Sequence, residues 1–190
     1  MSKLEKHLGG HNHKTHIDTG ALKWLKGSLG CKSLCDLGCG PGGMIEEAVK
    51  LGYSPVIGLD GDHTLKRTNK DLFILHDFTK GTVDLPEEQY DVCWCVEFVE
   101  HVYEEFIPNY VDVMQKCKYV VMTHAPVGWN GHHHVNCQDQ PYWVDMMNKF
   151  HLEYSEELTK QLHSATTMNI KNPRKSFVKN TGLVLKNAKL

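Results

Sequence analysis

The stretch CDLGCGPGG, residues 35–43, carries four glycines and a proline directly behind an aspartate. Glycines at this density lose much backbone entropy on folding, so we expect a ligand to occupy the room that the missing side chains leave. An apolar, strand-like run, KSLCDL (residues 32–37), leads into the glycines, and a helix-like run, MIEEAVK (residues 44–50), follows them. A glycine-rich turn from a strand into a helix brings backbone amides close to a ligand at the carboxyl edge of a sheet.

Strand-like and helix-like segments alternate along the chain. The expected strands lie at residues 32–38, 54–60, 71–78, 90–98, 118–126, 151–155 and 175–187. The expected helices lie at residues 17–30, 41–52, 99–117 with a break or restart at Pro108, 139–150 and 156–163. This alternation predicts an α/β fold with a doubly wound, mostly parallel sheet. The last two strands have no long crossover between them and predict a terminal antiparallel pair.

Length and composition limit the classes of protein. A chain of 190 residues that is 41% hydrophobic and 23% charged is expected to form one globular domain, residues 1–190, around a single core. No apolar run reaches the roughly 18 residues that a membrane-spanning helix needs, and the N-terminus lacks the apolar core of a secretory signal. The seven cysteines include no C-x-x-C pair, so we expect reduced, mostly buried thiols and a cytoplasmic location.

Charge is unevenly distributed. The formal net charge of −2 lacks the excess of positive charge that is typical of nucleic-acid-binding proteins. Residues 158–190, however, contain no acid and seven bases: Lys160, Lys171, Arg174, Lys175, Lys179, Lys186 and Lys189. This segment is either a solvated face or a surface for a phosphorylated or polyanionic substrate, and the sequence leaves both interpretations open.

Two cofactors fit the glycine pattern. Gly38-x-Gly40-x-x-Gly43, with Asp60 at the end of the next strand, matches the dinucleotide fingerprint of NAD-binding proteins. S-adenosylmethionine also has a ribose and an adenine, but it adds a methionine tail with an amine and a carboxylate. Asp36 can bind that amine or merely cap the loop. Asp77 is placed for the adenine amino group, and Phe78 either faces adenine or enters the core. NAD enzymes of the two-half kind also need a second mononucleotide unit, which this short chain lacks.

Several motifs in order resemble the class I S-adenosylmethionine-dependent methyltransferases. DLGCGPGG resembles the first motif of that family, GLDGD the acid after the second strand, LHDF the acid after the third, and YDVCWCVEFVEHV the motif at the fourth. The similarity runs from about residue 33 to 127. It implies the family's Rossmann-like sheet of seven strands, mostly parallel with an antiparallel last strand. It also implies that residues 1–19 form a lid over the cofactor.

The resemblance implies cofactor contacts at the ends of the first four strands, which are Asp36, Gly38, Cys39, Gly40, Asp60, Gly61, Asp77, Phe78 and Glu97. The backbone of the glycine loop would line the methionine moiety. Asp60 would hold both ribose hydroxyls, Asp77 would address adenine, and Glu97 would lie beneath the sulfonium.

The residues after the fourth strand bear on the methyl acceptor. Methylases of adenine or glutamine amides usually carry N-P-P-Y or D-P-P-Y at this place, whereas this chain has VEFVEH at residues 96–101. An oxygen nucleophile benefits from a base, and a histidine-rich loop follows the fifth strand. The candidate catalytic residues are therefore His134, His133 and His101. The loop histidines can also be hydrogen-bonded or solvent-facing residues without a catalytic role.

Glu97, Glu100 and His101 are spaced to share one face of a helix, where they could bind a divalent ion. This E-x-x-E-H resembles a motif in ubiquinone-pathway O-methyltransferases. It also resembles enzymes that methylate the 3′ ends of small RNAs, in which a later histidine, here His134, completes the site. In many members without a metal, the same residues only brace the loop, so no metal is assigned from the sequence.

The sequence therefore predicts an S-adenosylmethionine-dependent O-methyltransferase that acts on a small hydroxyl-bearing or sugar-like acceptor and releases S-adenosylhomocysteine. Two alternatives remain open. One is methylation of an RNA end or another polyanion, and the other is a non-catalytic nucleotide- or NAD-binding protein of the same fold. No membrane partner is expected.

Overall fold

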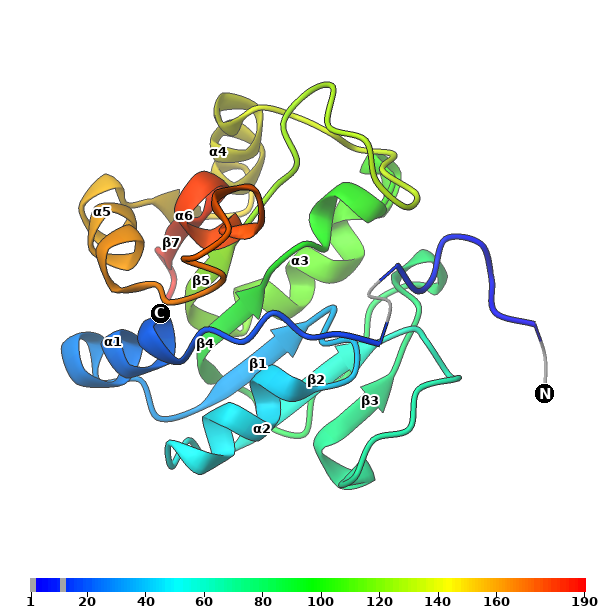
Figure 1. Cartoon of the computed structure of the whole chain (residues 1–190), viewed down its shortest axis with the longest axis horizontal. Helices are drawn as coiled ribbons and strands as arrows, with labels where there is room; N and C mark the ends of the chain where they lie inside the picture. Colours follow the sequence, from blue (N-terminus) through cyan, green and yellow to red (C-terminus); the bar gives the residue numbers. More distant parts are fainter. Residues whose placement is uncertain (1–2, 11–12) are drawn as a thin grey trace.

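The computed structural model describes residues 3–10 and 13–190 (Figure 1). Its strands are β1 (Leu34–Leu37), β2 (Val56–Asp60), β3 (Phe73–Leu75), β4 (Tyr90–Cys95), β5 (Cys117–Met122), β6 (Leu152–Tyr154) and β7 (Leu183–Asn187). They form one sheet in the order β3-β2-β1-β4-β5-β7-β6, in which β7 is antiparallel to both neighbours. The predicted seven-stranded sheet with an antiparallel last strand is confirmed.

Helices cover both faces of the sheet. They are α1 (Thr19–Leu29), α2 (Gly43–Lys50), α3 (Ile107–Gln115), α4 (Gln140–Asn148), α5 (Glu156–Ala165) and α6 (Phe177–Thr181). Short 3-10 turns are η1 (Lys70–Leu72), η2 (Phe78–Lys80), η3 (Val99–His101), η4 (Glu104–Phe106) and η5 (Pro173–Lys175). Helices α3 and α4 bury side chains against one face, and α1, α2, α5 and α6 against the other. No helix in the described part of the chain has the length and apolar character of a membrane span.

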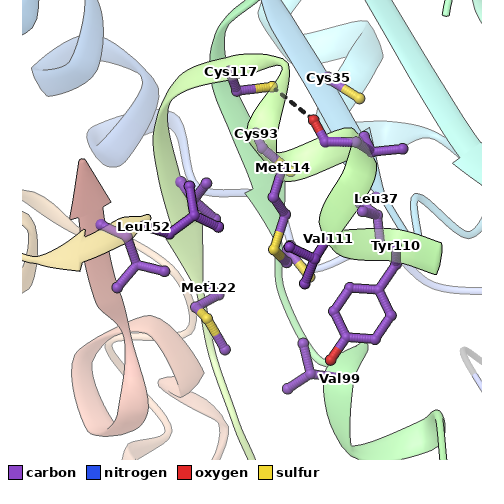
Figure 2. Packing of buried hydrophobic residues seen from close by; sticks show 14 of the residues in the cluster. Cys35, Leu37, Cys93, Val99, Tyr110, Val111, Met114, Cys117, Met122 and Leu152 are labelled. Atoms are coloured by element: carbon purple, nitrogen blue, oxygen red, sulfur yellow. Dashed lines mark hydrogen bonds between the residues drawn. The ribbon is translucent and has the colours of Figure 1, made fainter. Parts of the chain in front are cut away.

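Strand β4 shows why the sheet is buried on both sides. Val92 and Trp94 belong to the cluster beneath α1 and α2, whereas Cys93 and Cys95 belong to the cluster beneath α3 and α4. Alternate side chains of a strand point to opposite faces, so a continuous apolar run fits a strand covered on both sides. Figure 2 shows the second cluster, where the Cys117 thiol donates to a backbone carbonyl of α3 at 3.5 Å.

Helices α1, α2 and α4 lie within their predicted ranges of residues 17–30, 41–52 and 139–150. Helix α1 has Asp18 as its N-cap, and Gly30, in the left-handed conformation, is its C-cap. Pro41, expected at the first position of the next helix, lies instead in the preceding turn. Gly42, with φ of 91°, is the residue that precedes α2.

Two expected elements were wrong. The predicted strand at residues 175–187 begins as helix α6 and becomes β7 only at Leu183, because Val178 is buried beneath this helix in the core. Residues 99–106, expected to begin a long helix, form two short 3-10 turns. The restart at Pro108 is confirmed, since this proline occupies the first turn of α3.

Asp18 connects the start of α1 to the segment that follows α5. Its carboxylate accepts from the backbone N–H of Ala21 at 2.9 Å and from that of Thr167 at 2.8 Å, and it also accepts from the Thr166 hydroxyl. Asp18 is fully buried, so these bonds replace all of its water. The start of α1 and the segment after α5 are therefore held together by one side chain.

We predict that Asp18→Ala lowers the free energy of unfolding by about 3 kcal/mol. The change removes a helix cap worth about 1 kcal/mol and leaves a buried hydroxyl without its acceptor. Urea denaturation followed by circular dichroism measures the loss. Asp18→Asn keeps one acceptor oxygen and should lose less, and Asp145→Ala, at an exposed position on α4, serves as the control. Equal stability of Asp18→Ala and the wild type would contradict this bridging role.

Candidate functional site

A cavity of about 950 Å³ lies at the carboxyl ends of the parallel strands. It is lined by all of the predicted cofactor and catalytic residues, which are Asp36, Gly38, Cys39, Gly40, Asp60, Gly61, Asp77, Phe78, Glu97, His101, His133 and His134. Its volume falls in the range of roughly 300–1,000 Å³ that small-molecule sites occupy. The structure therefore brings these residues to one place, and their roles remain predictions.

The glycine loop is fitted closely against its neighbours. The amides of Gly38 and Cys39 both donate to the Leu59 carbonyl of β2, at 2.9 and 3.0 Å. Gly38 has φ of 77°, and a β-carbon there would lie 2.5 Å from the Phe98 ring. Only glycine meets both conditions without strain. The loop backbone, rather than a side chain, consequently forms this wall of the cavity.

Asp60 fixes the loop from the neighbouring strand. One carboxylate oxygen accepts from the Gly40 amide and the other from the Asp62 amide, each at 2.8 Å. Arg67 donates twice to the Gly40 carbonyl, at 2.7 and 3.1 Å, and lies 3.5 Å from Asp60 Oδ1. Arg67 lies in an irregular segment without a recognisable motif, so no pattern in the sequence indicates its contact with the glycine loop. Together these contacts hold the strand end and the loop in one arrangement.

Asp36 is the carboxylate best suited to a cationic ligand. It is 3% exposed and lines the cavity, and none of the described residues gives its carboxylate a hydrogen bond. Burial raises the pKa of the Asp36 carboxyl well above its usual range. A positively charged group in the cavity would supply the missing partner and favour the ionised form.

Asp77 is already engaged by the protein. One oxygen accepts from the amide and the hydroxyl of Thr79, at 2.9 and 2.8 Å, and the other lies 3.1 Å from His7 Nε2. Burial acts to raise the pKa of Asp77, but the hydrogen bonds from Thr79 and His7 lower it overall. Phe78 is 5% exposed and packs on the Phe98 ring, so most of this side chain belongs to the core.

Glu97 stands outside the turn that it was expected to share with Glu100 and His101. It precedes η3 and has a left-handed φ of 55°, so the expected common helix face is wrong. Its amide donates to Thr123 Oγ1 at 2.8 Å, and the same hydroxyl donates to its carboxylate at 3.1 Å. Burial raises the pKa of Glu97 to about 7, against the lowering effect of the Thr123 hydrogen bond.

Glu100, His101 and His134 form a group whose donor atoms all lie within 4.8 Å of one another. Both carboxylate oxygens of Glu100 are buried and have no hydrogen-bond partner among the described residues. The Glu100 carbonyl accepts from the amides of Val135 and Asn136, at 2.9 and 3.1 Å, which brings the histidine loop onto η3. A buried acid without a partner, facing two imidazoles, is chemically suited to a divalent cation.

Backbone carbonyls orient the two imidazoles of this group. His101 Nδ1 lies 2.7 Å from the His132 carbonyl, and His134 Nδ1 lies 3.1 Å from the Trp129 carbonyl. A carbonyl only accepts, so each Nδ1 carries a proton, and the neutral form of either ring has its lone pair on Nε2. Burial lowers the pKa of His101 to about 4, so this ring is neutral at physiological pH.

The N-terminal segment packs against the histidine loop. His132 Nε2 lies 3.3 Å from the Leu8 carbonyl, and the His133 ring contacts His7 at 6.2 Å and Tyr103 at 5.6 Å between centroids. Residues 3–10 thereby line the cavity, whereas residues 1, 2, 11 and 12 of the predicted lid lie outside the described residues. No pattern in the sequence indicates that His7 pairs with Asp77.

Comparison with protein families and curated proteins gives matches over part of the chain. A family model described as a methyltransferase domain matches residues 35–123. The ubiquinone biosynthesis O-methyltransferase of Shewanella halifaxensis is 34% identical over 101 residues, covering 49% of this chain and 40% of that protein. The enzyme of the same name from Bordetella pertussis is 32% identical over 123 residues, covering 57% and 46%. The matched parts amount to less than half the length of these relatives.

Solved structures share the fold over most of the chain. The methyltransferase domain of bacterial CtHen1-C superposes with a TM-score of 0.59 at 15% identity, covering 88% of this chain and 95% of that one. Magnesium protoporphyrin IX methyltransferase from Synechocystis PCC 6803, solved with bound SAM, gives 0.55 at 16% identity, covering 86% and 74%. At these identities the likeness concerns the fold.

We predict that Glu97 makes folding stability fall as pH rises from 4.5 to about 7. The unfolded chain ionises this carboxyl near its usual value of 4.5 and the folded chain near 7, so unfolding releases a proton between these values. The slope contributed by one such group approaches about 1.4 kcal/mol per pH unit. Urea denaturation across this range should show a flatter profile for Glu97→Gln. The control is Glu46→Gln, at an exposed position. If the stability profiles of the wild type and Glu97→Gln superimpose, or if Glu46→Gln flattens the profile equally, the raised pKa of Glu97 is contradicted.

Proposed function

We propose that this chain, which carries a class I S-adenosylmethionine-dependent methyltransferase domain, transfers the methyl group of S-adenosylmethionine to a hydroxyl oxygen of its acceptor. The observation that carries the choice of oxygen is the group of Glu100, His101 and His134 beside the cavity. The names of the two curated relatives, both O-methyltransferases, support the same choice.

The strand-end carboxylates suit the polar parts of the cofactor. Asp36 would accept from the methionine ammonium, since its carboxylate faces the cavity without a partner among the described residues. Each Asp60 oxygen accepts one amide bond and keeps a lone pair for a ribose hydroxyl. Asp77 keeps one acceptor position on the oxygen that contacts His7, so it can still accept from the adenine amino group. The backbone of Gly38 and Gly40 would line the methionine chain.

Methyl transfer breaks the sulfur–methyl bond and forms the oxygen–methyl bond, and the hydroxyl proton must leave the acceptor. The cofactor supplies an activated methyl group, so positioning accounts for much of the rate. His101 and His134 line the cavity, and because Nδ1 of each ring faces a backbone carbonyl, Nε2 of the neutral imidazole can take the hydroxyl proton. The products are then the methyl ether and S-adenosylhomocysteine.

A divalent cation is compatible with the same three residues. One buried carboxylate oxygen from Glu100 and the Nε2 atoms of His101 and His134 would hold it. Such an ion would place positive charge near the hydroxyl oxygen and favour loss of its proton. The His132 and Trp129 carbonyls keep both rings in the tautomer that either a base or a ligand requires.

We predict that Asp60→Ala weakens binding of S-adenosylhomocysteine more than tenfold. Charge-assisted hydrogen bonds to the ribose contribute roughly 1.5–3 kcal/mol each, and the glycine loop also loses its anchor. Isothermal titration calorimetry measures the dissociation constant, and thermal unfolding with ligand shows the accompanying stabilisation. Asp71→Ala, an exposed acid on η1, is the matched control. An unchanged constant in a folded Asp60→Ala variant would remove Asp60 from the cofactor site.

We predict that His134→Ala and His101→Ala each lower turnover by about 10²–10⁴-fold and leave S-adenosylhomocysteine affinity within about threefold. Labelled-methyl transfer to a panel of sugars, nucleotides, phenols and RNA measures turnover, with exposed His151→Ala as the control. Titration with Mn²⁺ separates the two roles of the histidines. A cation site predicts Mn²⁺ binding that Glu100→Gln abolishes, whereas a base predicts indifference to EDTA. Full turnover in both histidine variants would overturn the proposal.

A further inference from the structure

We propose that the methyl acceptor carries a phosphate group, bound by a basic rim at the cavity that consists of Lys14, Lys171, Arg174 and Lys175. The inference rests on the proposed function and names the substrate class for the same site. Its basis is the position, the bracing and the unpaired charge of these four side chains.

The rim joins the cavity to the acid-free part of the chain. Lys14 and Lys175 line the cavity itself, together with His16 and Phe177. Lys171 and Arg174 lie in the same loop as Lys175 and are exposed. An anion attached to a substrate in the cavity would therefore meet Lys14 and Lys175 inside and the other two cations outside.

The loop that carries three of these cations is internally braced. Ser176 is buried, and its hydroxyl donates to the carbonyls of Asn169 and Asn172, at 2.9 and 3.2 Å. The side-chain nitrogen of Asn169, Nδ2, donates to the Lys175 carbonyl at 2.8 Å and lies 3.0 Å from His16 Nδ1. These bonds fix the loop backbone and join it to the segment that contains Lys14.

The four cations have no counter-charge in the described part of the protein. No described carboxylate oxygen lies within 4.0 Å of any of them, whereas Lys116, Lys118 and Lys160 each pair with an acid. Burial and then the charges of Lys175 and Lys14 lower the pKa of His16, which agrees with both lysines lying around this ring. Unpaired like charges repel one another, and an anion bound between them would relieve that repulsion.

The number of cations favours phosphate over the carboxylate of the cofactor as their partner. The methionine tail offers one negative charge, and two of the four cations lie outside the cavity lining. A phosphate monoester carries a charge of about −1.5 to −2 and three acceptor oxygens, which suits several separate donors. A small phosphate ester and a nucleic acid end present this same chemistry, so the experiment must tell them apart.

The test uses the full chain saturated with S-adenosylhomocysteine and needs no turnover. The rim variant is Lys14→Glu with Lys175→Glu, and the matched control is Lys23→Glu with Lys189→Glu, two exposed lysines outside the cavity lining. The probes are inorganic pyrophosphate, glucose 6-phosphate with glucose as its neutral match, and a fluorescently labelled 16-nucleotide RNA. Calorimetry and fluorescence anisotropy measure binding at two salt concentrations.

We expect pyrophosphate to bind the wild type and the control alike, at least tenfold more weakly to the rim variant, and more weakly at high salt. Binding of glucose 6-phosphate but not glucose identifies a small phosphate ester, and binding of the RNA alone identifies a nucleic acid end.

Absence of pyrophosphate binding at millimolar concentration, or equal binding by the rim variant, overturns the inference. The inference is also overturned if the rim variant loses S-adenosylhomocysteine affinity tenfold while binding of pyrophosphate is unchanged, because the rim then serves the cofactor carboxylate. Failure of the wild type to bind S-adenosylhomocysteine would instead contradict the proposed function. The pyrophosphate titration of the ligand-free chain still decides the phosphate question in that case.

Discussion

Strands β1 and β4 are neighbours in the sheet, but the segments that follow them run toward opposite faces of it. The site depends on this divergence. Helix α2 follows β1 and buries Met44 against one face, whereas α3 follows β4 and buries Tyr110 against the other. The two connecting segments therefore separate at the carboxyl edge and leave a crevice between them. Asp36 at the end of β1 and Glu97 just after β4 are brought to one cavity by the strand order alone.

The regular part of this arrangement could be predicted from local patterns. Asp36, Asp60 and Asp77 each end or follow an apolar run, and parallel strands bring their carboxyl ends to the same edge. Residues in irregular segments carry no such periodicity. His7 lines the cavity and Arg67 holds the glycine loop through tertiary contacts, which no spacing in the sequence encodes. The strand predicted at residues 177–181 is wrong for a related reason. Phe177 and Val178 favour a strand, but burial of Val178 beneath a short helix decides the local structure.

The histidine-rich loop shows how the backbone sets side-chain chemistry. No acidic side chain is needed to orient His101 and His134. The His132 carbonyl fixes the ring of His101, and the Trp129 carbonyl fixes the ring of His134. The Glu100 carbonyl in turn holds the following stretch of the loop. The loop conformation and the availability of the two Nε2 atoms are thus coupled, so a change in loop length would alter the chemistry even if every histidine were kept.

The position of β7 has a consequence for how the chain folds. Strand β6 is made before β7, yet in the sheet its neighbour is β7, which lies between it and β5. During synthesis β6 therefore emerges without a partner and exposes an edge until residues 183–187 are available. Such a non-local insertion is slow, because loop-closure entropy must be overcome before the pairing forms. The β5 edge is likewise open in that interval, and an unpaired strand edge is a site for association between nascent chains.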